Sequence, residues 1–258
     1  MKFVINETLW NVNKAITIGN DHLIEKSNKQ DFCSLVHNDN IIVGVVCDGC
    51  SSAKHSEVGA TLIGTYLMNN LLAMRNRIDT LSIDEIRYDI GFGLTSFIRQ
   101  LCFNLGLDEN LQASFIEQCM TATFLFTVIT DGYIYIGQCG DGIIIINGDK
   151  NEIDQDDKPE YIAYCALPGA KKTFNDFINI TKFGIDGISD IAIATDGLGY
   201  LSKEKYPELY GTDKRQLQRK FNVWQNKKQE ILKDDVSLIV FEKEDIIGAN
   251  VDESKVQE

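Results

Sequence analysis

Residues 41–52 (IIVGVVCDGCSS) constrain the fold of this chain more than any other stretch. They begin with an apolar run in which β-branched residues dominate. Such a run is typical of a strand that is buried on both faces. The run stops at Asp48-Gly49 and a small polar tail. The sequence therefore predicts a buried strand that delivers one carboxylate to a loop.

Two further stretches place carboxylates at strand ends. Residues 191–198 (IAIATDGL) are a second apolar run that stops at Asp196-Gly197, and Asp234-Asp235 directly precedes the apolar residues 236–241 (VSLIVF). Carboxylates at the ends of buried strands suggest a cluster at one end of a sheet. Carboxylate and carbonyl oxygens suit hard cations such as Mg²⁺, Mn²⁺ or Ca²⁺ rather than zinc. Only three histidines are present, so a histidine-rich site is not expected.

An Asp-Gly pair is not by itself a sign of function. Five pairs occur, and glycine supplies the positive φ that many turns need while aspartate tolerates it. At Asp131 and Asp186 a turn is the favoured interpretation. Asp141 lies in the glycine-rich sequence GQCGDG, within a predicted hairpin. There a turn and a close approach to a ligand both remain open.

The order of predicted elements favours an α+β fold. Strands are predicted within residues 3–18 and at 32–36, 41–47, 122–130, 133–138, 142–147, 191–195 and 236–241. Helices are predicted at 57–74, at 82–104 after a Ser82–Glu85 capping box, and over most of 203–233. Residues 19–31 and 148–159 are expected to be loops, and 162–183 have no clear pattern. Because hairpins dominate, we expect antiparallel sheets covered by helices.

No domain boundary is evident. We expect one domain over residues 1–244 and a charged, flexible tail over 245–258. The net charge of −13 argues against a nucleic-acid partner. No stretch approaches the about 18 consecutive apolar residues of a membrane span. The N-terminus lacks the apolar core of a signal peptide, which predicts a cytoplasmic protein.

Cysteine and histidine residues point to no other kind of site. The seven cysteines are odd in number and have no framework spacing, so they are expected to be reduced. Cys47 and Cys50 form a lone CxxC without the βαβ context or second pair that redox or zinc sites need. They are interpreted as core and loop residues. His22 and His37 are interpreted as loop residues.

The order of the acidic motifs resembles that of the metal-dependent protein phosphatases of type 2C, most of all their compact bacterial members. The shared order is Asp-Gly after a buried strand, Gly-Asp-Gly in a hairpin, Asp-Gly after a second buried strand, and Asp-Asp before the last strand. The resemblance covers roughly residues 5–241. It implies a four-layer α-β-β-α sandwich, in which two antiparallel sheets are flanked by helices.

The resemblance also implies a centre for two Mn²⁺ or Mg²⁺ ions. Asp48 would bridge the ions, the carbonyl of Gly49 would bind one of them, and Asp196 and Asp234 would bind the other. Asp31 falls where the family holds a metal-bound water. Asp48, Asp196 and Asp234 are thus the residues expected to carry catalysis.

Three further positions follow from the same resemblance. Asp141 matches the position of a third, more weakly bound ion. Lys26 falls where many members carry a phosphate-binding arginine, and a point charge holds phosphate less specifically. Cys50 occupies the place of a histidine that is proposed to protonate the leaving group in eukaryotic members. A water or His55 would have to serve instead.

The implied activity is hydrolysis of phosphoserine and phosphothreonine in proteins by a hydroxide that bridges the metals. No cysteine is followed by arginine six positions later, so the loop of cysteine phosphatases is absent. The alternative is a pseudophosphatase, a non-catalytic module on the same fold that binds a phosphoprotein or a regulatory partner. The acidic residues favour the enzyme, whereas Cys50 and Lys26 keep the alternative open. The sequence names neither the substrate, the physiological metal nor the oligomeric state.

Overall fold

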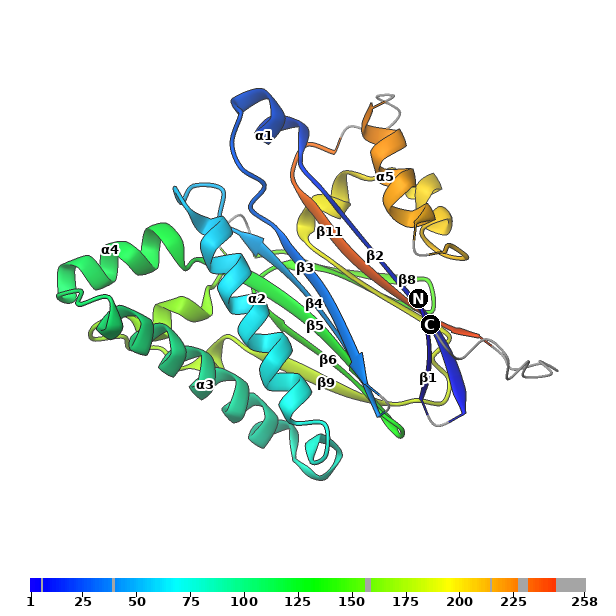
Figure 1. The fold of residues 1–258 in the computed structure, drawn as a ribbon, viewed down its shortest axis with the longest axis horizontal. Coiled ribbons are helices and arrows are strands. Elements are labelled where there is room, and N and C mark those ends of the chain that lie inside the picture. The colour runs from blue at the N-terminus through cyan, green and yellow to red at the C-terminus, as the bar shows by residue number, and fades with distance from the viewer. Residues whose placement is uncertain (6, 39, 156–158, 214, 227–231, 245–258) are drawn as a thin grey trace.

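Two antiparallel sheets face each other in the computed structural model, which describes residues 1–5, 7–38, 40–155, 159–213, 215–226 and 232–244 (Figure 1). The first sheet has the order β1-β2-β11-β10-β7-β8, with bounds Lys2–Ile5, Thr8–Thr17, Val236–Glu244, Asp190–Ala194, Gly142–Ile146 and Asp149–Ile153. The second has the order β3-β4-β5-β6-β9, with bounds Phe32–Asn38, Ile41–Gly49, Ala122–Ile129, Tyr133–Cys139 and Asn179–Gly184.

Helices cover the outer faces of both sheets. Helices α2 (Ser56–Ala73), α3 (Ile83–Asn104) and α4 (Glu109–Cys119) lie on the side of the second sheet (Figure 1). Helix α5 (Gln216–Asn226) lies against the first sheet, where it packs on β2. The predicted α+β sandwich of two antiparallel sheets flanked by helices is therefore confirmed.

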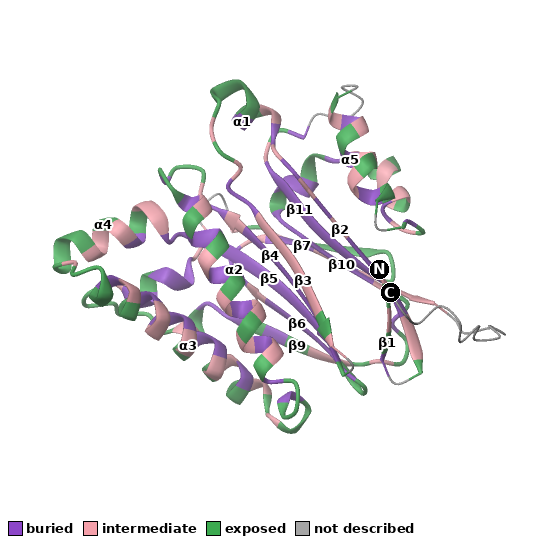
Figure 2. Cartoon of the chain, in the orientation of Figure 1, coloured by how far each residue is buried: buried purple, intermediate pink, exposed green. Residues whose placement is uncertain are grey.

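Strand β4 is buried on both faces, as its apolar run predicts (Figure 2). Val43, Val45 and Cys47 join the core beneath the helices, whereas Ile42 and Val46 join the core between the sheets. The period of two along a strand explains this division. A continuous apolar strand is therefore needed at this position, and it ends at the site described below.

Helix α3 begins at the predicted capping box. The backbone N–H of Glu85 donates to Ser82 Oγ at 3.2 Å, and the backbone N–H of Ser82 donates to the Glu85 carboxylate at 2.8 Å. Gly91 and Gly93 lie inside the helix against Phe174 and Tyr66, respectively. These glycines permit close packing and do not break the helix.

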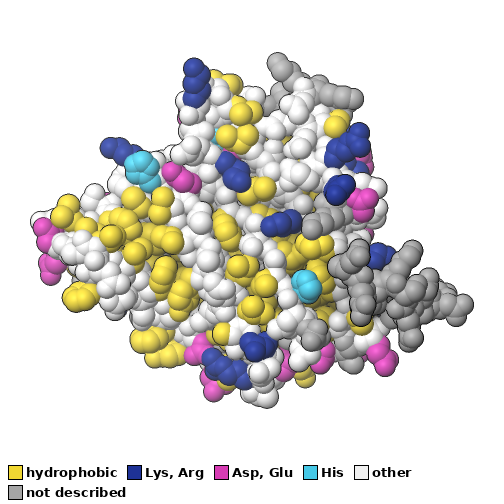
Figure 3. Space-filling model, in the orientation of Figure 1, with side chains coloured by type: hydrophobic (Ala, Val, Ile, Leu, Met, Phe, Trp, Pro, Cys, Tyr) yellow, Lys and Arg dark blue, Asp and Glu magenta, His cyan; other side chains and the backbone are white. Residues whose placement is uncertain are grey.

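Apolar side chains are also exposed on the helical layer (Figure 3). On α3, the rings of Tyr88 and Phe92 are about half exposed and stack with centroids 5.4 Å apart. This surface carries none of the residues predicted to bind metal or phosphate. Helices α2, α3 and α4 thus form an outer layer of the sandwich, and none of the residues predicted to bind metal or phosphate lies in them.

The predicted hairpin around Asp141 is wrong. Strand β6 belongs to the second sheet and β7 to the first, so residues 140–141 cross between the sheets. Gly140 has φ +88° and Gly142 has φ +144°, which lets the chain turn sharply at this crossing. By contrast, the hairpin at Asp131 is confirmed, since β5 and β6 pair and the N–H of Thr130 donates to the carbonyl of Tyr133.

Several polar segments have more structure than their sequences predict. The expected loop at 19–31 contains helix α1 (Asn20–Glu25), and the expected loop at 148–159 contains β8. The unassigned stretch 162–183 contains short 3-10 helices and part of β9, and helix α4 has no predicted counterpart. Most of these elements are too short to show periodicity, so tertiary packing decides their conformation.

Some predictions fall outside the described residues. These are the tail at 245–258, residue 39 between the predicted strands at 32–36 and 41–47, and part of the helical stretch at 227–231. Among the residues that the structure does describe, no helix is both long and apolar enough to cross a membrane.

Candidate metal centre

Asp48 lies at the end of β4, where the strand leaves the core. Its pKa is raised well above the ordinary value, first by burial and then by the negative charges of Asp31, Asp196 and Asp234. The fold therefore brings together three carboxylates that the sequence pattern singles out (Asp48, Asp196 and Asp234) and Asp31, which the family resemblance implies. Their mutual repulsion is the electrostatic situation that a bound cation relieves.

Hydrogen bonds between β10 and β11 bring the second and third acidic motifs to the same end of the first sheet. The N–H of Thr195 donates to the carbonyl of Ser237 at 3.0 Å, and the N–H of Ser237 donates to Thr195 Oγ1 at 2.9 Å. Asp196 directly follows and starts the short helix η4 (Asp196–Tyr200). Asp234 lies two residues before the start of β11, so the two carboxylates lie at the same paired strand end.

Asp31 is buried at the start of β3 and connects the two sheets. Thr195 Oγ1 donates to Asp31 Oδ2 at 2.8 Å. Burial is the main cause that raises the pKa of Asp31 to about 8, and the charge of Asp235 adds to it. Among the described residues, the buried Oδ1 atom of Asp31 has no aligned hydrogen bond, and the Asp48 carboxyl and the Ser237 hydroxyl lie beside the same carboxyl group. An oxygen left in this way fits a ligand or water at the centre.

The two adjacent acids before β11 have different surroundings. Asp235 is 1% exposed and accepts the backbone N–H groups of Gly19 and Gln30, both at 2.6 Å. Asp234 is half-buried, and burial raises the pKa of its carboxyl. It lines a cavity of about 340 Å³ whose other lining residues are Asp21, His22, Glu25, Ser51, Ser52, Tyr200 and Lys233. Asp234 thus faces the cavity, whereas Asp235 holds the backbone at Gly19 and Gln30 next to the start of β11.

Gly49 allows a close approach of backbone segments beside Asp48. A Cβ atom at Gly49 would lie 2.8 Å from both the carbonyl oxygen of Gln30 and Ser56 Oγ. No side chain fits there, and the backbone of Gly49 stays close to the acidic cluster. The next residue, Cys50, has its thiol 3.2 Å from Ser52 Oγ and its N–H donating to the carbonyl of Thr121.

Lys26 and Asp141 lie at the margins of this arrangement. Lys26 is exposed and ends helix α1 in a left-handed conformation with φ 57°. It does not line the cavity, although α1 borders it through Asp21, His22 and Glu25. The pKa of Tyr161 is raised by burial and by its contact with Cys50, and then by the charges of Asp48 and Asp141. Asp141 is therefore close enough to Tyr161 for its charge to act on the phenol.

A family comparison now bears on this geometry. The family model for protein phosphatase 2C matches residues 18–235. The chain belongs to the protein phosphatase 2C family. The match contains every predicted site residue, from Lys26 to Asp234. Among curated protein sequences, no match is found.

Several solved structures, serine and serine/threonine phosphatases among them, share the fold. A bacterial serine phosphatase is 14% identical with a TM-score of 0.60, covering 90% of this chain and 97% of its own. RsbX in complex with magnesium is 14% identical with a TM-score of 0.55, covering 95% and 100%. The catalytic domain of the serine/threonine phosphatase PstP, with two manganese ions, is 10% identical with a TM-score of 0.54, covering 92% and 99%. At these identities the likeness concerns the fold.

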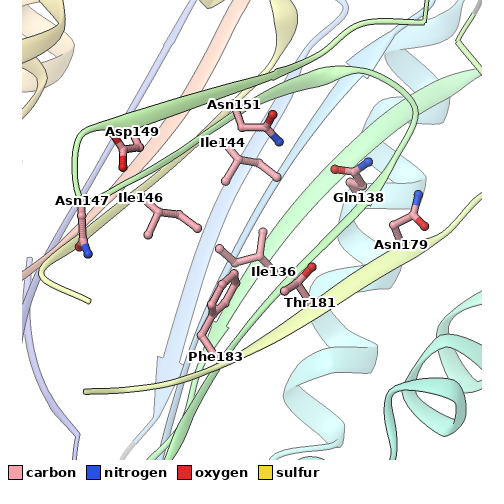
Figure 4. A pocket seen from close by; sticks show the side chains of 10 residues that line it. All are labelled: Ile136, Gln138, Ile144, Ile146, Asn147, Asp149, Asn151, Asn179, Thr181 and Phe183. Atoms are coloured by element: carbon pink, nitrogen blue, oxygen red, sulfur yellow. The ribbon is translucent and has the colours of Figure 1, made fainter. Parts of the chain in front are cut away.

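Another cavity lies between β6 and β9 of the second sheet and β7 and β8 of the first (Figure 4). None of the residues in the acidic cluster lines it. It measures about 390 Å³, and its lining residues are Ile136, Gln138, Ile144, Ile146, Asn147, Asp149, Asn151, Asn179, Thr181 and Phe183. Asp149 is its one ionisable side chain among the residues described. For this 2C-family chain, the acidic end of the sandwich is therefore the candidate site.

Two residues near the site, His22 and Tyr161, were not found from the sequence, and Asp235 was noted there only as part of the Asp234-Asp235 pair. His22 was expected in a loop but is 8% exposed, and its Nδ1 lies 2.9 Å from Asp235 Oδ1. Asp235 is the partner that holds it, and Tyr161 lies on the Cys50 side of the cluster. The doubled acid at 234–235 was the one available signal, because the other contacts join distant parts of the sequence.

Proposed function

We propose that this protein is a Mn²⁺- or Mg²⁺-dependent phosphatase that hydrolyses phosphoserine and phosphothreonine monoesters in proteins. One observation carries the proposal: burial and the charges of Asp31, Asp196 and Asp234 together raise the pKa of Asp48. Four acidic groups at one place cost free energy unless cations neutralise them. Membership of the 2C family adds the reaction class.

Each residue has a role in this proposal. Asp48 would bind both ions, the carbonyl of Gly49 would bind one, and Asp196 with Asp234 would bind the other. When bound, such ions activate a water to the hydroxide that attacks phosphorus, and they offset charge on the phosphoryl oxygens. Two manganese ions in PstP support the number, and magnesium in RsbX supports the alternative metal.

The remaining groups act on water and phosphate. Asp31 orients the attacking water through Oδ1, the oxygen that has no aligned hydrogen bond among the described residues. Lys26 attracts the phosphate as a point charge from the exposed end of α1. Asp141 would hold a third, weaker ion, and its effect on Tyr161, which also contacts Cys50, supports a place near the site. Water returns a proton to the leaving group, because Cys50 stands where a histidine is expected.

The substrate is proposed to be a phosphorylated protein in the cytoplasm. The competing function is a pseudophosphatase that binds a phosphoprotein or regulatory partner without turning it over. Cys50 favours that alternative, since its thiol offers no ready acid of the imidazole kind. The complete set of carboxylates favours the enzyme.

Hydrolysis of p-nitrophenyl phosphate and of a phosphothreonine peptide tests the two functions. We expect turnover with Mn²⁺ or Mg²⁺ and its loss with EDTA. Asp131→Asn is the control variant, because this residue lies in the β5–β6 turn, and it should retain turnover. Peptide binding without turnover in either metal would support the binding module and reject the enzyme.

A further inference from the structure

The imidazole of His22 lies against the carboxylate of Asp235, which backbone hydrogen bonds hold in place. The imidazole is buried in α1, with Nδ1 2.9 Å from Asp235 Oδ1. Both oxygens of Asp235 also accept short backbone hydrogen bonds, from Gly19 to Oδ1 and from Gln30 to Oδ2. Asp235 is therefore fixed in place, and it leaves Nε2 as the nitrogen of His22 that faces other groups.

The next neighbour of His22 is a residue proposed to bind metal. One nitrogen of His22 and one carboxylate oxygen each from Asp234 and Asp235 lie within 4.8 Å of one another. His22 and Asp234 both line the 340 Å³ cavity. Because the oxygens of Asp235 are engaged, Nε2 of His22 and the carboxylate of Asp234 are the ligand atoms that remain.

Metal-binding histidines commonly donate the second ring N–H to a carboxylate, which fixes the tautomer and the ring orientation. The Nδ1 atom of His22 lies 2.9 Å from Asp235 Oδ1, where such a carboxylate lies, and the N–H is not aligned for a hydrogen bond. We propose that His22 binds one of the divalent ions through Nε2, together with Asp234, and that Asp235 positions it. The inference rests on the proposed metal centre and adds a ligand to it that the acidic motifs do not contain.

The chemical consequence is a preference among metals. Magnesium favours oxygen ligands, whereas an imidazole binds transition ions more strongly. A centre with one histidine ligand should therefore select Mn²⁺ over Mg²⁺. Without His22, the site would be built from oxygen atoms alone and would discriminate less.

Pulsed electron paramagnetic resonance of the Mn²⁺-loaded protein detects such a nitrogen directly. We expect electron spin echo modulation from a bound ¹⁴N, and its replacement by the ¹⁵N pattern in wild-type protein made with ¹⁵N-labelled histidine. His22→Ala should lose the coupling. His55→Ala is the matched control, because its side chain is 62% exposed, and it should retain the coupling.

Calorimetric titration supplies a second readout that does not depend on turnover. In His22→Ala the affinity for Mn²⁺ should fall about tenfold or more, while that for Mg²⁺ should change less than about twofold. His55→Ala should leave both affinities unchanged.

The outcomes separate this inference from the proposed function. Bound Mn²⁺ without histidine nitrogen coupling would overturn the role of His22 and leave the phosphatase intact. Failure of wild-type protein to bind Mn²⁺ would overturn both. If His22→Ala does not fold, the isotope exchange in wild-type protein, with His37→Ala and His55→Ala to exclude the other histidines, still decides the question.

Discussion

At the scale of single residues, Asp48 is the carboxylate on which the negative charges of the acidic cluster act together. In Asp48→Asn the side chain keeps its size but loses its charge, so the repulsion from Asp31, Asp196 and Asp234 is relieved. We expect the metal-free variant to be at least as stable as wild type in urea denaturation, and metal-dependent turnover to fall about 100-fold or more.

The control for Asp48→Asn is Asp131→Asn, which removes an acid at the β5–β6 turn. Its stability and turnover should stay close to wild type. A large loss of stability in metal-free Asp48→Asn would contradict the metal-binding role of Asp48, since it would show that the charge stabilises the fold by itself.

The sequence predicts single residues at this site unevenly. Asp48, Asp196 and Asp234 stand at the ends of apolar runs, so a local pattern is enough to single them out. His22 and Asp235 meet across most of the chain, and neither lies in a pattern that indicates the other. Contacts between polar loops leave no periodic signal, and this contact was therefore missed.

At the scale of elements, the segment before β11 has two neighbouring acids with different roles. Asp234 lines the cavity, and Asp235 accepts hydrogen bonds from two backbone N–H groups. Asp235→Asn replaces an acceptor oxygen by an amide that faces a backbone N–H. We expect a loss of stability of about 1–3 kcal/mol, since one buried donor remains unsatisfied. Asp234→Asn can still accept the N–H of Asp235 through its amide oxygen. We expect it to keep its stability and lose metal binding.

Urea denaturation in EDTA, followed by titration with Mn²⁺, compares these two variants directly. Equal destabilisation of Asp234→Asn and Asp235→Asn would contradict this assignment. It would mean that Asp234 stabilises the fold as much as Asp235, which hydrogen-bonds the backbone of the 19–30 segment.

Elements differ in how well their sequence predicts them. Strand β4 and helix α3 follow from apolar runs, spacing and a capping box. Helix α1 could not be predicted in the same way, because its six residues are anchored from outside. The N–H groups of Asn20 and Asp21 donate to the carbonyls of Leu232 and Lys233. The sequence also did not predict that the chain passes from one sheet to the other after β6, because glycines occur both in hairpin turns and in crossings between sheets.

At the scale of the whole molecule, the cluster makes stability depend on pH and metal. The pKa of Asp31 is raised to about 8 in the folded protein, and that of Asp48 is also raised. The metal-free folded state therefore binds more protons than the unfolded state between about pH 4 and pH 8. Stability should fall as pH rises through this range, by at most about 1.4 kcal/mol per pH unit for each carboxyl.

Thermal unfolding at several pH values, with EDTA or with Mn²⁺, measures this effect. Bound metal should raise the unfolding temperature most at the higher pH, since it neutralises the ionised carboxylates. Asp31→Asn should show a flatter pH dependence in EDTA. A stability of the metal-free wild type that rises between pH 5 and pH 8 would contradict the raised pKa values.

The position of β11 has a consequence for the order in which a cell can assemble this protein. The strand lies between β2 and β10, and residues 232–235 fasten the segment at 19–30. As the ribosome delivers the chain, β2 can pair with β1 at once, but its other edge waits for β11, which is translated some 200 residues later. The acidic cluster cannot close before then. A nascent chain should consequently lack the assembled acidic cluster until the last strand has been translated.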